Sequence, residues 1–434
     1  MQSLVGPRLS LMMFLQFFMW GVWWVPLAIY MGTEEVGMAA IIGTAYLSQP
    51  IGAMISPFFL GLVADRYFPT EKVLAVLHIL GGALLLAVPY YAQMPDGTGQ
   101  TMFITMIILH MLCYMPTIGL TNAIAFNTMT DPGKQFPIIR VFGTIGWIAS
   151  GLLVGFGLNY FMTATAEHTV WPFYLGAGAG FILGLYSLTL PHTPPPLKGQ
   201  KPTLSAIIGL DAVRQLSSQS FWTFIIASML ICIPLAAYYS FAGLYAGHAG
   251  MEQVSGWMST GQMSELLFML LMPFAFSRLG VKWMLLIGMM AWVARYALFA
   301  IGAPEGIFPL ILVGIILHGI CYDFFFVTGM IYVEKRSSPA IRAQAQGFLV
   351  QMTLGVGMFV GMLVSGSLFN SIIGESTGAE RLQNYQLFWA IPALFAFFVM
   401  IGFWLLFKDD IKPAAEADVD EEDIATAAAV DEQP

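Results

Sequence analysis

Long apolar stretches follow one another along almost the whole chain, and they constrain its fold more than any motif does. A helix needs about 20 consecutive apolar residues to cross a bilayer. Stretches of that kind occupy residues 9–31, 36–63, 73–92, 102–125, 137–162, 171–190, 220–244, 254–277, 283–302, 307–332, 343–369 and 387–407. Only helices and closed barrels satisfy the backbone inside lipid. The pattern therefore predicts an all-α membrane protein with twelve transmembrane helices.

The composition argues against a soluble domain. Charged residues make up 10% of the chain, whereas about 25% is usual for soluble proteins. Cys113, Cys232 and Cys321 lie inside apolar stretches, with no His or Cys at metal-ligand spacing, so we expect buried side chains, no metal site and no cofactor. The first stretch runs to Met31 without a small-residue cleavage site, which predicts a retained span rather than a signal peptide.

The basic residues gather on one side of the predicted spans. All of the 17 lysines and arginines except Arg295 and Arg381 lie in the connections after every second span or beside the chain ends. Positively charged connections stay in the cytoplasm. The bias therefore places both termini in the cytoplasm.

The central connection divides the chain into two halves. Residues 191–219 form the longest predicted cytoplasmic loop, which starts with a proline-rich run and contains a short amphipathic stretch, Leu204–Leu216. We expect residues 1–190 and 220–407 to form one six-helix bundle each. Residues 408–434 are acidic and lack aromatic side chains, so we expect a disordered cytoplasmic tail.

A related turn closes the second span of each half. Gly61-Leu62-Val63-Ala64-Asp65-Arg66 ends the second span, and Pro273-Phe274-Ala275-Phe276-Ser277-Arg278 ends the eighth. The first copy is similar to the loop motif of the major facilitator superfamily, and the second is a degraded copy. This resemblance implies two six-helix bundles with a solute site between them at mid-membrane. We expect Asp65, Arg66 and Arg278 to act in gating or in structure.

Two carboxylic acids lie inside predicted spans. An ionisable group near mid-bilayer costs roughly 2.5–3.5 kcal/mol, so it faces a cavity or a partner. Glu265 follows Gln262 by three residues on one helix face, which fits either a structural hydrogen-bonded pair or a solute-binding carboxylate that carries a proton. Asp323 is flanked by aromatic residues and has no basic neighbour in sequence. We favour a functional role for it.

Two arginines lie in or beside spans. Arg295 needs a partner, for which either carboxylic acid is a candidate, and the pair could be structural or mechanistic. Arg140, Thr144 and Trp147 follow at i, i+4 and i+7, hence on one helix face. A cation, a hydroxyl and an indole on one stripe suit a polar, ring-bearing solute. The alternative for Arg140 is an arginine that reaches the membrane surface.

Aromatic stripes are also present in the first and fourth predicted spans. Gln16, Trp20 and Trp23 share one face, and we expect Gln16 to contact the solute. His110 and Tyr114 share another face. Aromatic faces stack on flat rings, but most aromatic residues in membrane helices simply pack. We expect the histidines in the spans to be buried and satisfied rather than proton relays.

Distinctive blocks follow one another along nearly the whole chain. They are Leu15-Gln16-Phe17, Tyr114-Met115-Pro116-Thr117, Phe136-Pro137, Gly143-Thr144-Ile145-Gly146, Leu188-Thr189-Leu190-Pro191-His192, Ser264-Glu265, Asp323-Phe324-Phe325 and Ser338-Pro339-Ala340-Ile341-Arg342-Ala343. In these blocks and their order the chain resembles the bacterial nucleoside–proton symporters of the major facilitator superfamily.

This resemblance implies the residues of a solute site. The counterparts of the family's solute and coupling residues are Arg140, Thr144, Gln262, Glu265 and Asp323, with aromatic positions at Trp147 and Tyr322. Asp323 and Glu265 are the implied proton carriers. Where the family has two amide side chains in the seventh span, this chain has Ala236 and Tyr239, and we expect Tyr239 to contact the solute.

The sequence therefore predicts a symporter of the bacterial inner membrane that imports nucleosides or related polar metabolites with protons, by alternating access. One alternative keeps the fold and moves a sugar, amino sugar or cell-wall fragment, as the residues Ala236 and Tyr239 suggest. Another is a membrane sensor or enzyme, but the sequence has no nucleophile–base arrangement, metal cluster or phosphate-binding loop. The expected partners are the solute, protons and the bilayer. We expect a monomer and no binding of nucleic-acid polymers.

Overall fold

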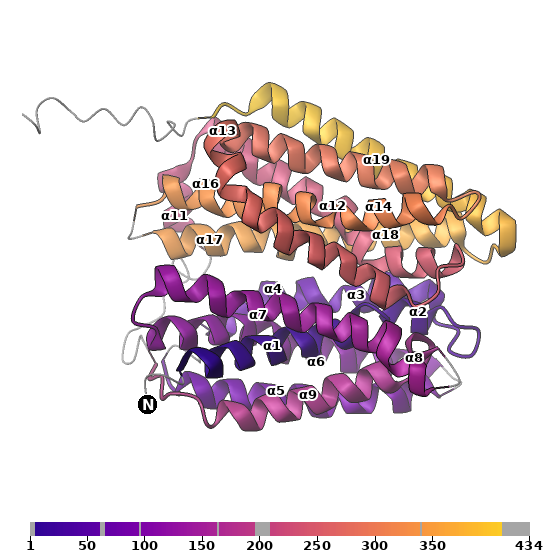
Figure 1. Cartoon of the computed structure of the whole chain (residues 1–434), viewed down its shortest axis with the longest axis horizontal. Helices are drawn as coiled ribbons and strands as arrows, with labels where there is room; N and C mark the ends of the chain where they lie inside the picture. Colours follow the sequence, from indigo (N-terminus) through magenta and orange to yellow (C-terminus); the bar gives the residue numbers. More distant parts are fainter. Residues whose placement is uncertain are drawn as a thin grey trace, which may run out of the picture.

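The computed structural model describes residues 5–60, 66–94, 97–162, 165–195, 209–338 and 341–409. This part of the chain is helical and contains no strand, so the predicted all-α class is confirmed. Its helices run roughly side by side in two layers, one above the other (Figure 1). We call them the N-terminal bundle and the C-terminal bundle.

The N-terminal bundle contains the elements α1 (Val5–Trp24), α2 (Leu27–Met31), η2 (Ala39–Ile41), α3 (Ile42–Tyr46), α4 (Ser48–Phe59), α5 (Thr70–Ala92), α6 (Gly97–Thr128), α7 (Pro132–Leu152), η4 (Leu153–Gly157), α8 (Leu158–Phe161), η5 (Ala166–His168) and α9 (Trp171–Ser187). Within it, α1 packs against α7 and α9, and α5 packs against α6 and α9. Small residues permit these close crossings.

The C-terminal bundle follows the central loop. It contains α11 (Leu210–Leu216), α12 (Gln219–His248), α13 (Val254–Gly302), α14 (Phe308–Ile316), α15 (His318–Cys321), η6 (Tyr322–Val327), α16 (Thr328–Arg336), α17 (Arg342–Val350), η7 (Gln351–Gly357), α18 (Met358–Leu368), η8 (Phe369–Ile373) and α19 (Gly378–Leu406). Here α13 packs against α14, α15 and α19, and α12 packs against α18 and α19.

Nine helical stretches of the described residues are long and apolar enough to cross a membrane. One of them, α13, has 49 residues, which is about twice the length that one crossing needs. A break at Gly280 (φ 66°, ψ −178°) divides it. This break lies between the predicted eighth and ninth spans. With the shorter helices α3, α4 and α9, the layout is consistent with twelve crossings.

The turn around Gly280 is fixed by the last helix. Lys282 Nζ donates to the carbonyl oxygens of Trp404 at 2.9 Å and Phe407 at 2.7 Å, so a cation satisfies the carbonyl end of α19. The guanidinium of Arg278 lies 3.9 Å from the centre of the Phe274 ring. Both contacts give this turn a structural role.

Several predicted features fall wholly or partly outside the described residues. Asp65, most of the acidic tail and the first part of the amphipathic stretch Leu204–Leu216 are among them. The described end of that stretch is helix α11. Arg66 is described and buried.

The start of the central loop is attached to the N-terminal bundle. Glu71, at the beginning of α5, is buried and accepts a hydrogen bond from the backbone N–H of Thr193 at 3.0 Å. Its other carboxylate oxygen lies 2.9 Å from Nδ1 of His192. The polypeptide therefore leaves the first bundle from a fixed point.

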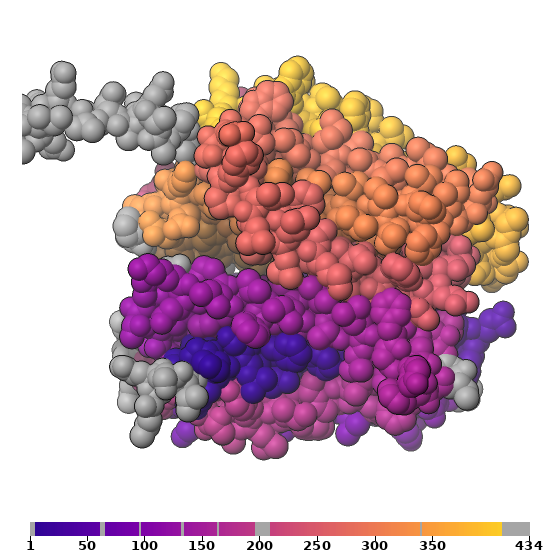
Figure 2. Space-filling view, in the orientation of Figure 1, coloured from indigo at the N-terminus to yellow at the C-terminus, as the bar shows by residue number. Residues whose placement is uncertain are grey.

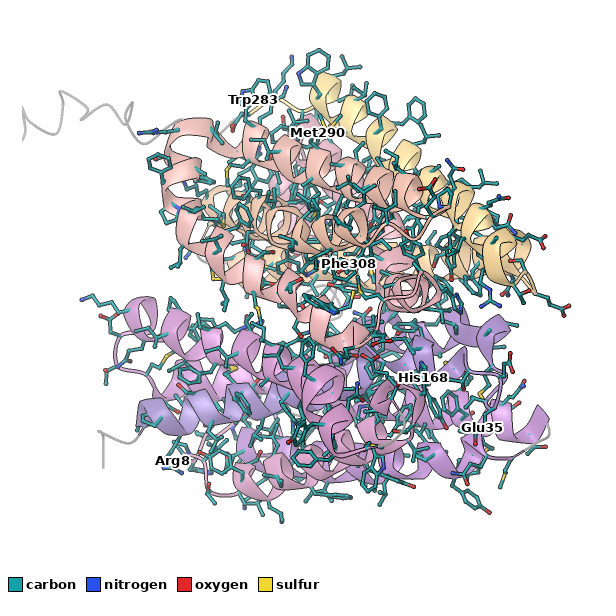
Figure 3. The ribbon with its side chains drawn as sticks, turned by 45° about the vertical axis from the view of Figure 1, so that its right-hand side comes forward. Arg8, Glu35, His168, Trp283, Met290 and Phe308 are labelled. Atoms are coloured by element: carbon teal, nitrogen blue, oxygen red, sulfur yellow. The ribbon has the colours of Figure 1, made fainter. Side chains whose placement is uncertain are left out.

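The two ends of the molecule differ in how closely the bundles approach. We call the end with Arg8 and the described C-terminus the terminal end, and the opposite end, with Glu35 and His168, the distal end (Figure 3). The bundles meet where the last turns of α7 and η4 cross the first turns of α13. They also meet where α3 crosses α18 and α4 crosses η7. Figure 2 shows a recess between them toward the terminal end.

Candidate functional site

The N-terminal bundle contributes one face of α7 to the space between the bundles. Arg140 and Trp147 are half-buried, and Thr144 is buried with 9% of its surface exposed. The guanidinium of Arg140 lies 4.2 Å from the centre of the Phe17 ring. Phe17 therefore supports the cation from α1, while the sequence pattern keeps all three α7 residues on one stripe.

The C-terminal bundle contributes charged and polar groups from two elements. Gln262 and Glu265 lie on α13, and Tyr322 and Asp323 begin η6. Glu265 lies within electrostatic range of Arg140 of the other bundle. It also lies within electrostatic range of Asp323 and Tyr322. The predicted residues of the two halves thus converge on one region between the bundles.

Aromatic rings close this region on one side. Trp20 of α1 packs edge-to-face on Trp147, with ring centres 5.2 Å apart, and a second contact joins it to Tyr114 at 5.3 Å. The space beside them holds about 20 Å³ and is lined by Trp24, Val25, Trp147, Tyr238, Tyr239, Gly243, Met258 and Gln262. That volume is close to one water molecule. A ring-bearing solute therefore needs the space on the terminal side of these rings, or a movement of them.

Asp323 is fully buried, and neither of its carboxyl oxygens has a hydrogen-bond partner in the described part of the chain. It sits in η6, a π-helical turn, where the wider winding interrupts the regular hydrogen-bond ladder. Such turns are common at functional sites. A buried carboxyl group without a partner is costly as an anion and inexpensive as a neutral acid.

Gln16 is placed inside the N-terminal bundle, where both ends of its amide are occupied. Its Nε2 donates to Oγ1 of Thr117 at 2.7 Å, and its Oε1 lies 2.8 Å from Nε2 of His78. Tyr114 donates its hydroxyl to the Gln16 carbonyl at 2.6 Å. In this conformation the Gln16 amide is fully buried and bonded to Thr117 and His78, so it does not face the space between the bundles.

Arg295 does not form the predicted ion pair, because no carboxylate of the described residues lies within ion-pair distance. The guanidinium is fully buried, donates from Nε to the Gly314 carbonyl at 2.9 Å, and lies 4.0 Å from the centre of the Tyr238 ring. Its charge is therefore stabilised by a carbonyl and an aromatic face. The sequence pattern could not reveal these partners, since neither is an acidic residue.

The two positions that depart from the family pattern have different surroundings. Ala236 is fully buried and faces Gly361 of α18. Tyr239 is half-buried and lines the small space between the bundles. Only Tyr239 is therefore in a position to contact a solute in this conformation.

His318, one of the histidines expected to be buried, lies beside the site. His318 packs against Tyr238 with ring centres 5.7 Å apart, and against Tyr239 and Tyr322 at 6.5 and 5.9 Å. Its position four residues before Tyr322, on the same helix face, was the sequence feature that could have placed it beside the site. Among the described residues, no group of three or more His, Cys, Asp or Glu side chains could hold a metal ion.

Comparison with known proteins identifies the family of this chain. The nucleoside H+ symporter family matches residues 4–412. The putative nucleoside transporter YegT of Escherichia coli is 38% identical over 96% of this chain and 97% of its own length. The nucleoside permease NupG of the same species is 34% identical over 92% of this chain and 95% of its own length.

Solved structures give the same result. The crystal structure of the NupG D323A mutant has a TM-score of 0.81 and 33% identity, covering 93% of this chain and all of that one. A D-xylose–proton symporter shares the fold at a TM-score of 0.67 and 15% identity, covering 94% of this chain and 97% of that one. The predicted fold class, that of the major facilitator superfamily, is confirmed, and the chain belongs to the nucleoside H+ symporter family.

Proposed function

We propose that this protein imports nucleosides across the bacterial inner membrane together with protons. The observation that carries the proposal is the convergence of charged groups from both bundles, Arg140 on one side and Glu265 with Asp323 on the other. A site shared by two bundles is exposed to one side of the membrane or the other as the bundles rock. The family and its relatives named above support nucleosides as the solute.

The roles follow from the chemistry of each group. Arg140, Thr144 and Gln262 offer donors to ring nitrogen, carbonyl and hydroxyl groups, and Gln262 and Glu265 offer acceptors. Trp147, Tyr322 and Tyr239 present rings on which a base can stack. Asp323, which is buried and has no hydrogen-bond partner in the described part of the chain, holds and releases the proton in this proposal. Glu265 interacts electrostatically with it.

The energy available is sufficient for accumulation. One charge moving through 100 mV yields about 2.3 kcal/mol, and a tenfold concentration ratio requires about 1.4 kcal/mol. One proton per nucleoside therefore supports useful uptake. We infer from the lysine and arginine bias that the terminal end faces the cytoplasm. In this proposal the described conformation, which has its recess at that end, releases solute inward.

Reconstituted vesicles test the proposal. Purified protein is placed in liposomes, and uptake of labelled uridine and adenosine is measured with and without an inward proton gradient. We expect accumulation only with the gradient. Equal nucleoside uptake with and without the gradient would show that protons do not drive transport.

The choice between nucleosides and saccharides needs a separate measurement. Thermal unfolding of the purified protein is compared in the presence of nucleosides, sugars and amino sugars, because a ligand that binds the folded state raises its stability. We expect stabilisation by nucleosides alone. Stabilisation by saccharides alone would show that this protein binds a saccharide rather than a nucleoside.

A further inference from the structure

Glu167 is a buried carboxylate at the distal end that the solute site does not use. It lies on η5, a short turn between α8 and α9, and 1% of its surface is exposed. Carboxylates in loops are ordinarily solvated, and a buried one needs a partner. Its partner is in the other bundle.

The partner is the first turn of α13. The carboxylate of Glu167 accepts a hydrogen bond from the backbone N–H of Ser255, the second residue of the helix. The first four N–H groups of a helix have no partner within it and are ordinarily satisfied by the side chain at the N-cap. In α13 the N-cap is Gln253, which has a left-handed conformation (φ 57°) and makes no capping hydrogen bond. Glu167 therefore caps a helix of the opposite bundle.

The turn that carries Glu167 is held rigidly. Asn159 donates from Nδ2 to the Gly155 carbonyl at 2.8 Å and accepts at Oδ1 from the Ala166 N–H at 2.7 Å. Thr169 donates to the Ala166 carbonyl at 2.7 Å. These bonds fix η5 to the end of η4, so the position of Glu167 follows the position of that helix.

The same helix end makes a close contact with the other bundle. A Cβ atom added to Gly155 would lie 2.7 Å from the Gly256 Cα, and one added to Gly151 would lie 2.8 Å from the Ser255 carbonyl oxygen. The Glu167 bond and the glycine contact therefore involve the same turn of α13. Separating the bundles at the distal end breaks both.

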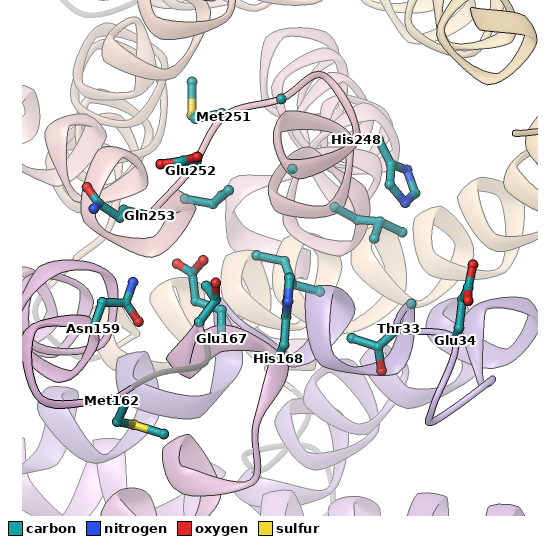
Figure 4. A pocket seen from close by; sticks show the side chains of 17 residues that line it. Thr33, Glu34, Asn159, Met162, Glu167, His168, His248, Met251, Glu252 and Gln253 are labelled. Atoms are coloured by element: carbon teal, nitrogen blue, oxygen red, sulfur yellow. The ribbon is translucent and has the colours of Figure 1, made fainter. Parts of the chain in front are cut away.

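A cavity of about 760 Å³ lies outside this contact, between the bundles (Figure 4). Both bundles contribute its titratable side chains, which are Glu34, Glu167, His168, His248 and Glu252. Its walls include the Glu167 turn and residues 250–254 just before and at the start of α13. The Glu167 bond thus lies at the wall of this cavity.

We propose that Glu167 is a positioning residue for transport, which holds the distal end closed by capping α13 across the bundle interface. The proposal rests on the proposed function, because closure at one end while the other is open is what transport by alternating access requires. In the state that is open at the distal end, the Ser255 N–H loses this acceptor. Removing the acceptor therefore weakens the closed state relative to the open one.

A distance measurement between spin labels tests the proposal without any solute. The labels are attached at Tyr160→Cys and Glu305→Cys, exposed distal positions of the two bundles, after the three native cysteines are replaced by alanine. In Glu167→Ala we expect the ratio of short to long distances to fall about fivefold. This is the change in an equilibrium constant that the loss of a typical helix cap produces. Glu167→Gln retains an acceptor oxygen and should restore the short distance.

The control is Glu252→Ala, which removes an exposed carboxylate of the same cavity. We expect it to leave the distances as in the parent protein. An unchanged distribution in Glu167→Ala, or a Glu167→Gln protein that opens as far, would overturn the proposal. Because no solute is present, failure of nucleoside uptake would count against the proposed function and leave this result standing.

Discussion

At the scale of single residues, the proposed coupling role of Asp323 follows from the lack of hydrogen bonds to its carboxyl group. Both of its oxygens are buried and have no hydrogen-bond partner among the described residues. Glu265 lies within electrostatic range, so a negative charge on one acid disfavours a charge on the other. Binding and release of one proton therefore change the electrostatics of the whole site.

Replacing Asp323 by asparagine keeps the shape and removes the proton. In Asp323→Asn we expect gradient-driven nucleoside accumulation to fall at least tenfold, the effect of about 1.4 kcal/mol, while exchange of internal for external nucleoside continues. Both are measured as uptake into vesicles. The matched control is Glu380→Gln, an exposed carboxylate of α19. Equal accumulation by Asp323→Asn and the control would show that the proton binds elsewhere.

Glu167 gives the distal end a pH dependence. Burial raises the pKa of Glu167 above the ordinary value of 4.5, and the hydrogen bonds from Ser255 only partly offset this effect. The closed state then binds the proton more tightly than an open state in which the carboxylate is solvated. Proton binding to Glu167 therefore stabilises the closed state fully at pH values below the ordinary pKa of 4.5. This stabilisation is lost as the pH rises through the raised pKa.

The distances between the spin labels should show the same direction of pH dependence. As the pH rises from 4.5, we expect the short-distance fraction to decrease in the parent protein and to remain more nearly constant in Glu167→Gln. His168, His248, Glu34 and Glu252 face the same cavity, and their titration remains in both proteins. Identical pH profiles would assign the dependence to one of these neighbours.

The Gln16 network is a test of structure rather than of transport. In Thr117→Val the Nε2 donor of buried Gln16 loses its acceptor, which costs about 1–3 kcal/mol. We expect a lower thermal unfolding temperature. Thr105→Val in the same helix removes only a local bond to the Thr101 carbonyl and should have little effect. Equal destabilisation by both changes would mean that the bond between Gln16 and Thr117 does not contribute specifically to stability.

At the scale of elements, we expect the contact of η4 with α13 to limit how closely the bundles meet. In Gly155→Ala the new methyl group would meet the backbone of Gly256, which cannot move aside as a flexible side chain can. We expect the spin-label distance at the distal end to increase. Gly178→Ala on α9 is the control, because nothing lies within 4 Å of its added Cβ. A closed distal end in Gly155→Ala would show that this contact is not limiting.

The length of the apolar stretches predicted the helices, because the bilayer dictates how long a crossing must be. The same pattern could not predict how each helix face is used. Gln16 was expected to contact the solute, but its partners His78 and Thr117 lie 62 and 101 residues away in sequence. The pairing of Glu167 with Ser255 likewise joins a loop to a helix 88 residues later. Such contacts depend on tertiary structure, which local periodicity does not contain.

At the scale of the whole molecule, two bundles meet at the distal end and part toward the terminal end. The charged site lies between these regions, with the aromatic rings toward the contact. Opening the distal end therefore requires the loss of the contacts at that same end, which are hydrogen bonds and close glycine crossings rather than a covalent link. In the proposed function, coupling of solute and proton requires both bundles, because each supplies part of the charged site.

Proton movement driven by nucleoside is the most direct test of this account. Vesicles containing the purified protein and an internal pH-sensitive dye are mixed with uridine or adenosine, with no proton gradient imposed. We predict acidification of the interior on addition of nucleoside, and none in Asp323→Asn. Nucleoside entry in the parent protein without any acidification would contradict the account.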